Sequence, residues 1–166
     1  SLANEIAGFP QTVHRRDILT TYPYPNTLVV LEVTGAVLRQ AIERSAEYFD
    51  LDADGRLTIS DRFLKPKVEH YNYDYFAGIS YVIDVSRPAG ERVVLLEHGG
   101  VPVRDGDMFT LCMNNYRSSG AGGYFAYQTC PVVKEINVEM SDLLMDYFEK
   151  TPEISCPSAR AYRVIW

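Results

Sequence analysis

Residues 22–35 read YPYPNTLVVLEVTG and predict a stiff turn, a buried strand and the start of a helix. Two prolines restrict the backbone of the turn, so Tyr24 and Asn26 are held in fixed directions. The run at residues 27–33 is short and rich in β-branched side chains, which is typical of a strand. Thr34 and the glycine after it end the strand, and a threonine at this position is suited to cap a helix.

The helix predicted next spans residues 36–49. Its apolar residues recur at three- and four-residue intervals and form one stripe, as on a helix that packs against a core. The stripe consists of Val37, Leu38, Ala41, Ile42, Ala46 and Phe49. Arg39, Glu43 and Glu47 fall on the other side of the helix, which we expect to face solvent.

The rest of the chain alternates short strands with turns. Strands are predicted at residues 79–85, 92–96, 108–113 and 161–166, and a short helix at residues 141–149 with Leu143, Leu144, Tyr147 and Phe148 facing inward. The turn SRPAGE at residues 86–91 joins the first two of these strands as a hairpin. Hairpins pair strands antiparallel, so the pattern favours a single α+β domain over a fully parallel sheet.

Composition and charge narrow the range of partners. A chain of 166 residues with 46% hydrophobic and 23% charged residues can form one globular domain with a core of its own. Its net charge of −6 argues against a nucleic-acid polymer, which requires a clustered basic surface. We expect no membrane span and find no signal peptide. Because the chain begins with Ser-Leu rather than Met, we expect it to be part of a longer protein.

Two segments have the composition of a ligand site. Tyr24 beside Asn26 offers a ring face for stacking and an amide for a ring edge, although the same tyrosine could instead pack on the core. The segment NNYRSSGAGGY at residues 114–124 is too rich in glycine and serine for regular structure, and its small residues allow a backbone to approach a ligand closely. It lacks the Lys-Ser/Thr of a phosphate-binding P-loop, so an ATPase of that type is excluded.

The segment DLDADGRLTISD at residues 50–61 has the acidic spacing of a calcium-binding loop, and the helix before it could serve as the entering helix. Asp61 stands where such loops have a bidentate glutamate, and Pro66 leaves little room for an exiting helix. An acidic surface turn needs no calcium, so both interpretations stay open. The three histidines lie in unrelated contexts, and neither H-E-x-x-H nor G-x-S-x-G is present. We therefore expect no catalytic residues in this chain.

Three blocks resemble the C-terminal domain of the 5'-nucleotidase family, which includes UDP-sugar hydrolases and 2',3'-cyclic-nucleotide 2'-phosphodiesterases. They are the segment YPYPNTLVVLEVTG quoted above, YNYDYFAGISYVIDVSRPAGERV at residues 71–93, and MNNYRSSGAGGYF at residues 113–125. The blocks stand in family order and span nearly the whole chain. The resemblance implies that residues 1–166 form one substrate-binding domain, with mixed sheets and flanking helices in an α/β/β/α layered arrangement.

The resemblance also implies which residues bind the substrate. Tyr24 and Tyr116 match the two aromatic residues that stack on the base, and Asn26 matches the amide that contacts it. Gly120 and Gly122 belong to the glycine-rich loop of the site. In 5'-nucleotidases an aspartate that binds the ribose stands at the position of Gly122, so the glycine departs from their mode of sugar recognition. The sequence NNYR at residues 114–117 and the tyrosine at both stacking positions look more like the cyclic-nucleotide 2'-phosphodiesterase/3'-nucleotidase branch.

Two parts of such an enzyme are expected upstream of this chain. One is the metallophosphoesterase domain with two divalent metal ions, and the other is a strand whose arginine binds the nucleotide. The resemblance thus implies a nucleotide or nucleoside ligand, a partner domain in the same polypeptide, no cofactor in this chain, and export to the periplasm, cell wall or medium. The alternatives are the same domain of a 5'-nucleotidase or UDP-sugar hydrolase, and a non-enzymatic binding module, with or without structural calcium.

Overall fold

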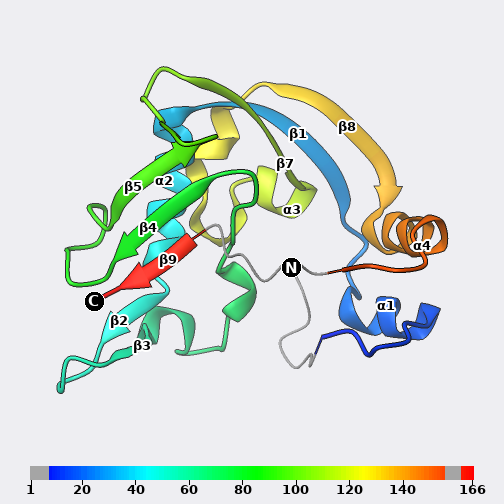
Figure 1. The fold of residues 1–166 in the computed structure, drawn as a ribbon, viewed down its shortest axis with the longest axis horizontal. Helices are drawn as coiled ribbons and strands as arrows, with labels where there is room; N and C mark the ends of the chain where they lie inside the picture. The colour runs from blue at the N-terminus through cyan, green and yellow to red at the C-terminus, as the bar shows by residue number, and fades with distance from the viewer. Residues whose placement is uncertain (1–7, 156–161) are drawn as a thin grey trace.

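The computed structural model describes residues 8–155 and 162–166, and their strands form three sheets (Figure 1). Only one strand pair in these sheets is parallel, and helices flank the sheets. The predicted α+β class with mixed sheets and layered helices is therefore confirmed.

The first sheet is antiparallel and is centred on the predicted strand. Its order is β7 (Met108–Asn114), β1 (Thr27–Thr34) and β8 (Val132–Glu139). Alternate residues of β1 are buried, as expected for a strand with one face on the core: Val29, Leu31 and Val33. The sequence did not predict β8, because most of its residues are exposed on this edge strand and show no clear alternation.

The second sheet contains the predicted hairpin. Its order is β6 (Val101–Pro102), β5 (Val93–His98), β4 (Ser80–Asp84) and β9 (Tyr162–Ile165). β9 is the predicted closing strand and pairs parallel to β4, while residue 161 lies outside the described residues. A separate two-stranded hairpin joins β2 (Phe49–Leu51) to β3 (Leu57–Ile59).

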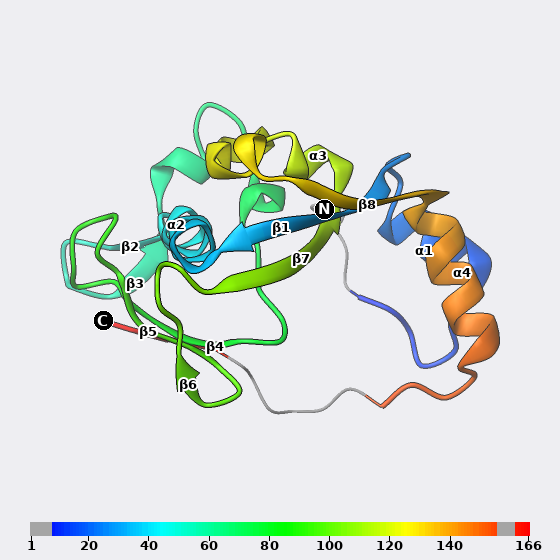
Figure 2. The same cartoon turned by 90° about the horizontal axis from the view of Figure 1, so that it is seen from above.

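Helix α2 (Gly35–Ala46) packs against β1 of the first sheet and β5 of the second. The short helices lie on the side of α2 away from β4 and β5, as Figure 2 shows. Thr34 caps it as predicted, because its hydroxyl accepts a hydrogen bond of 3.2 Å from the amide of Val37. The predicted apolar stripe forms the helix face of the core. The helix ends at Ala46, three residues earlier than predicted, since Phe49 begins β2.

The polar face of α2 meets solvent only in part, because Arg39, Glu43 and Glu47 are each partly buried. Glu43 accepts the backbone N–H groups of Val93 at 2.6 Å and Arg92 at 3.0 Å, and Arg39 donates to the carbonyl of Val93 at 3.0 Å. The side chains of this face therefore satisfy backbone groups where β5 begins. Glu47 is also partly buried and accepts hydrogen bonds from two arginines.

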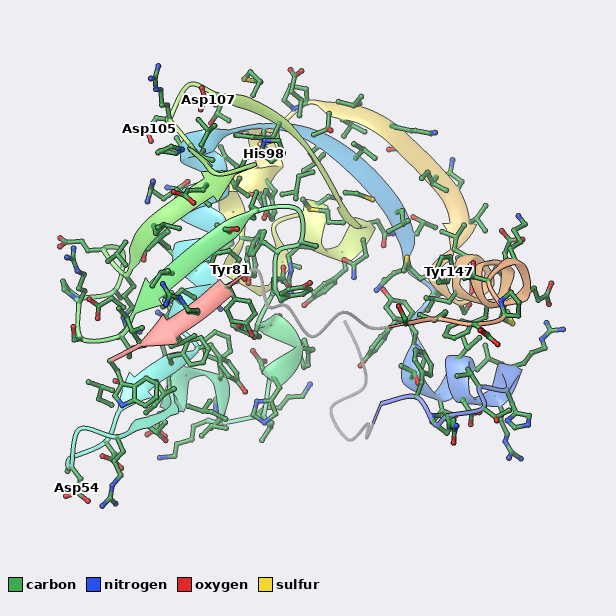
Figure 3. The ribbon with its side chains drawn as sticks, viewed as in Figure 1. Asp54, Tyr81, His98, Asp105, Asp107 and Tyr147 are labelled. Carbon is green, nitrogen blue, oxygen red and sulfur yellow. The ribbon has the colours of Figure 1, made fainter. Side chains whose placement is uncertain are left out.

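Two further helices pack together beside the end of β8. These are α1 (Arg15–Thr21), which the charged sequence did not predict, and α4 (Met140–Lys150), which was predicted. Of the residues predicted to face inward, Leu143, Leu144 and Phe148 are partly buried, whereas Tyr147, labelled in Figure 3, is 52% exposed. Met145 is the apolar residue of α4 that is buried. The remaining short helices are α3 (Asn115–Ser118), η1 (Asp61–Phe63), η2 (His70–Asn72), η3 (Ala121–Gly123) and η4 (Phe125–Thr129).

The acidic segment at residues 50–61 forms the β2–β3 hairpin, with Asp54 at its tip in Figure 3. The carboxylate of Asp52 accepts the backbone N–H groups of Asp54 and Arg56, each at 2.9 Å, so it organises a tight turn. No helix enters this turn, because α2 ends before β2, and the helix–loop arrangement behind the calcium prediction is wrong. Among residues 8–155 and 162–166, no three His, Cys, Asp or Glu side chains group together to hold a metal ion.

Within the same residues, no helix is long and apolar enough to cross a bilayer.

Candidate functional site

The proline-rich turn and the end of β7 are joined directly by side chains. The hydroxyl of Tyr22, which is 5% exposed, accepts hydrogen bonds of 3.2 Å from the amides of Asn26 and Asn114. The side-chain carbonyl of Asn115 accepts the backbone N–H of Thr27 at 3.3 Å. The bonds of Asn114 and Asn115 fix the first predicted ligand segment against the second, where β1 begins and β7 ends. The bond of Asn26 holds the proline-rich turn itself.

Tyr24 is the more exposed tyrosine of the proline-rich turn. Its ring packs edge-on against buried Tyr22, with centroids 6.2 Å apart, yet 40% of the residue remains exposed. Of the two tyrosines in this turn, Tyr22 is therefore a core residue and Tyr24 is not. Asn26 lies in the same turn, half-buried, and directs its amide to Tyr22.

Tyr116 stands directly after β7, in the single turn of helix α3. Asn114 caps this turn, because its side-chain carbonyl accepts the N–H of Arg117 at 2.8 Å. The prediction that the whole segment is irregular was wrong at this point, since an asparagine after a strand is a good helix cap. Tyr116 is 39% exposed, so both predicted stacking tyrosines present ring surface from neighbouring segments.

The glycine-rich turn after α3 packs closely against the rest of the domain. Gly120 and Gly122 have φ of 85° and 74°, a backbone region that favours glycine. A side chain at position 122 would collide with the guanidinium of Arg117 and the side-chain oxygen of Asn72, because both lie less than 3.0 Å from the place that its Cβ would occupy. A side chain at position 120 would meet Gln128 at 2.7 Å. Both glycines are thus needed for the shape of the turn.

Arg117 is the residue of this region that the sequence analysis missed. It is 4% exposed and binds the carboxylate of Asp74 with two nitrogens, Nε at 2.6 Å and Nη2 at 2.9 Å. Burial raises the pKa of Asp74, and the charge of Arg117 opposes that shift. No signal in the sequence pointed to this anchor, because its partner Asp74 lies 43 positions away in the chain.

Arg44 of α2 holds the same turn from the other side. Its Nε donates to the carbonyl of Gly122 at 2.9 Å, and its guanidinium lies 4.7 Å from the centre of the Phe63 ring. Next to it, the hydroxyl of buried Tyr124 bonds with Ser45 at 2.7 Å. The turn is therefore fixed to the core through α2.

This arrangement can bind a planar ligand. Two partly exposed phenol rings lie on segments that side-chain hydrogen bonds join, and such rings can stack on a planar base. The charged groups nearest the turn, Arg44, Asp74 and Arg117, bond to one another or to the protein backbone.

A second surface feature lies at the opposite end of β7. A shallow hollow of about 290 Å³ is lined by turn and strand residues. They are His98, Val101, Pro102, Val103, Asp107, Met108 and Phe109, with His98 and Asp107 labelled in Figure 3. None of the residues predicted to bind the substrate lines it.

Comparison with known proteins identifies the family to which this geometry belongs. A family model described as 5'-nucleotidase, C-terminal domain matches residues 2–129. The chain belongs to the 5'-nucleotidase family, of which it is a C-terminal domain. The predicted family is thereby confirmed.

Individual relatives agree with this assignment. The 2',3'-cyclic-nucleotide 2'-phosphodiesterase/3'-nucleotidase of Haemophilus influenzae is 32% identical over 153 residues, which cover 83% of this chain and 23% of that protein. The trifunctional nucleotide phosphoesterase protein YfkN of Bacillus subtilis is 30% identical over 138 residues, covering 76% of this chain and 9% of YfkN. The chain thus spans less than a quarter of either curated relative.

A solved structure from Staphylococcus aureus is similar along the whole chain. It is a protein classed as a 5'-nucleotidase, in complex with alpha-ketoglutarate, and it superposes with a TM-score of 0.93 at 44% identity. The match covers 99% of this chain and 32% of that one. A 5'-nucleotidase precursor from Thermus thermophilus, at 22% identity and a TM-score of 0.70, shares the fold.

Proposed function

We propose that this chain is the base-binding domain of a phosphoesterase that hydrolyses 2',3'-cyclic nucleotides and 3'-nucleotides. The observation that carries the proposal is the placement of Tyr24 and Tyr116. Their rings are 40% and 39% exposed, and they stand on two segments that Tyr22, Asn114 and Asn115 tie together. Curated relatives from three bacteria, at 32–34% identity, support this substrate class through their names.

In this proposal the domain binds the base and another domain performs the hydrolysis. The base stacks between Tyr24 and Tyr116, and Asn26 contacts its edge. Stacking tolerates any base, because every base has a π face. Gly120 and Gly122 shape the turn beside the sugar. The phosphate then extends beyond this chain towards two divalent metal ions, which would polarise the phosphoester and activate water.

The metals belong to the other domain in this proposal, because the described residues contain no group of three metal-binding side chains. The longer relatives leave room for such a domain, since this chain covers only 9–32% of those compared above. We propose further that the parent protein is exported, on the basis of the family resemblance. Fractionation of the source cells tests this point, and recovery in the cytoplasm alone would contradict it.

A second candidate is the same domain of a 5'-nucleotidase. The Staphylococcus aureus structure favours it, since it has the highest identity of the proteins compared above. The parent protein with its metals, assayed on 2',3'-cyclic AMP, 3'-AMP and 5'-AMP, separates the two candidates. We expect higher kcat/KM on the first two substrates, whereas a clear preference for 5'-AMP would establish the second candidate.

The base site itself is tested by calorimetric titration with adenosine and 3'-AMP. We expect Tyr116→Ala to weaken binding by about 1–3 kcal/mol, the range for loss of one stacking contact. Tyr147→Ala is the matched control, because it also removes a partly exposed tyrosine, 52% exposed on α4, outside the site. Equal binding by both variants and the unmodified protein would rule out Tyr116 as a stacking residue.

A further inference from the structure

Tyr116 stands on a helix that cannot hold a ring in place by itself. α3 has four residues, and a single helical turn is unstable in isolation because its first hydrogen bonds do not offset the loss of backbone freedom. The Asn114 cap fixes only the start of this turn. The bond from Thr27 to Asn115 likewise holds only the first residue of α3, so the contacts of the residues after Tyr116 contribute to the orientation of its ring.

Arg117, the next residue, makes those contacts. Nε and Nη2 bind the two oxygens of Asp74, and Nη2 also donates to the carbonyl of Tyr71 at 3.1 Å. Nη1 donates to the carbonyl of Ala121 in the glycine-rich turn. A guanidinium has five N–H groups, so these bonds engage most of its donors with protein groups. Arg117 is also 4% exposed, which leaves it no route to a ligand phosphate.

The same guanidinium lies near two tyrosine rings. Its central carbon is 4.2 Å from the centre of the Tyr124 ring and 5.6 Å from that of Tyr116. Both distances fall within the range of cation–π attraction. Tyr124 is 2% exposed and its hydroxyl donates to the carbonyl of Asn72 at 3.1 Å, so this ring is fixed in the core. Arg117 thereby connects the exposed ring of Tyr116 to a rigid part of the domain.

We propose that Arg117, held by Asp74, is a positioning residue for Tyr116 and the glycine-rich turn, and that it does not contact the nucleotide. This inference rests on the proposed function. Arginine suits the role better than lysine, because its planar fork binds a carboxylate with two nitrogens while its face lies near a ring. Gly122 is required for this arrangement, because a side chain at position 122 would occupy the space that Arg117 and Asn72 fill.

The test uses kinetics of the metal-loaded parent protein on two substrates. One is 2',3'-cyclic AMP, and the other is bis(p-nitrophenyl) phosphate, which has no base to stack. We expect Arg117→Met and Asp74→Asn to raise KM for the cyclic nucleotide about tenfold, the order expected when one stacking contact is lost. We expect kcat on the nucleotide, and kcat/KM on the base-free substrate, to change less than twofold.

Three further variants make the result specific. Arg56→Met is the matched control, because Arg56 forms a surface ion pair with Asp54 in the β2–β3 turn and should leave both substrates unaffected. In a Tyr116→Ala background, Arg117→Met should add less than a twofold rise in KM, because the ring it positions is gone. Arg117→Lys keeps a cation and covers the case in which Arg117→Met does not fold. It should raise KM for the nucleotide at least threefold.

Each outcome decides one of the two proposals. If the unmodified parent hydrolyses no nucleotide, or Tyr116→Ala leaves its nucleotide KM unchanged, the proposed function fails. If Tyr116→Ala raises KM but folded Arg117 variants do not, the positioning role is overturned. Equal losses on both substrates, or full additivity with Tyr116→Ala, would also overturn it, because a general structural defect gives that result.

Discussion

The hydroxyl of Tyr22 lies 3.2 Å from the side-chain amide of Asn114, although 92 positions separate these residues in the chain. The same oxygen accepts a bond from Asn26, so one buried phenol joins the proline-rich turn to the end of β7. The two exposed tyrosines of the candidate site stand immediately beside this junction. The geometry of the site therefore depends on a residue that cannot itself contact a ligand.

Replacing this buried phenol tests the junction. Tyr22→Phe keeps the ring but removes the acceptor of two hydrogen bonds, and the amides of Asn26 and Asn114 lose a partner. We expect the free energy of unfolding to fall by about 1–3 kcal/mol. Urea denaturation measures this change. Tyr24→Phe makes the same chemical change on an exposed ring and should cost less than about 0.5 kcal/mol. Equal costs would contradict the role of the junction.

Gly122 offers a test of crowding in the glycine-rich turn. Gly122→Ala imposes a side chain at φ of 74° and forces it against Arg117 and Asn72. Gly90→Ala is the control, because Gly90 has φ of 92° and nothing within 4 Å of an added methyl group. Backbone strain alone costs about 1–3 kcal/mol, so we expect Gly122→Ala to exceed Gly90→Ala by at least about 1 kcal/mol in urea denaturation. Similar losses would show that the turn can relax away from Arg117.

Glu43 tests whether α2 secures the start of β5. Glu43→Ala removes the acceptor of the N–H groups of Arg92 and Val93 and should lower the free energy of unfolding by about 1–3 kcal/mol. Glu149→Ala changes an exposed helical glutamate in α4 and should stay within about 0.5 kcal/mol. Hydrogen exchange should show faster exchange of the Val93 amide in the first variant. An unchanged exchange rate would contradict the contact.

Buried tyrosines predict a loss of stability in alkali. Burial raises the pKa of Tyr81 to about 12, from an ordinary value of 10.0. The folded protein thus holds this proton more tightly than the unfolded chain. The resulting stability is complete below pH 10 and is lost as the pH rises through the folded pKa. Burial also raises the pKa of Tyr124 and of Tyr127, in the same direction.

Urea denaturation at a series of alkaline pH values measures this effect. Tyr81→Phe should be less stable than the unmodified protein at pH 7, since the N–H of Phe76 loses its acceptor at 3.2 Å. Its stability should fall less steeply above pH 10, because one buried titrating group is gone. Parallel curves for the two proteins would mean that Tyr81 does not contribute to the alkaline loss.

Local pattern was enough to predict the centre of the fold. β1, the Thr34 cap, α2 and the β4–β5 hairpin depend on alternation, helical spacing and turn residues, all of which lie within short segments. The same reasoning was right only in part for Glu43 and Arg39, which have the sequence of a solvated helix face. Their partners are backbone groups of β5, about fifty positions away, and no local pattern reveals them.

The candidate site was likewise predicted only in part from the sequence. Tyr24, Asn26 and Tyr116 were predicted from their surroundings in the sequence and from the family resemblance, and the structure places them on adjoining segments. Arg117 was not predicted as an anchor, because a charged residue in a glycine-rich stretch is usually solvated. Its burial depends on the Asp74 carboxylate, which comes from another part of the fold, and on the ring of Tyr124, which the fold of the turn brings against it.

The parallel pairing of β9 with β4 has a consequence for how the protein is made. β4 occupies Ser80–Asp84, but its second neighbour in the sheet, Tyr162–Ile165, is synthesised much later. Until those residues leave the ribosome, one edge of β4 is unpaired, and the ring of Tyr81 lacks the stacked partner that it has in Tyr162 at 5.2 Å. A nascent chain that stalls before residue 162 would therefore present an open strand edge, a natural target for a chaperone.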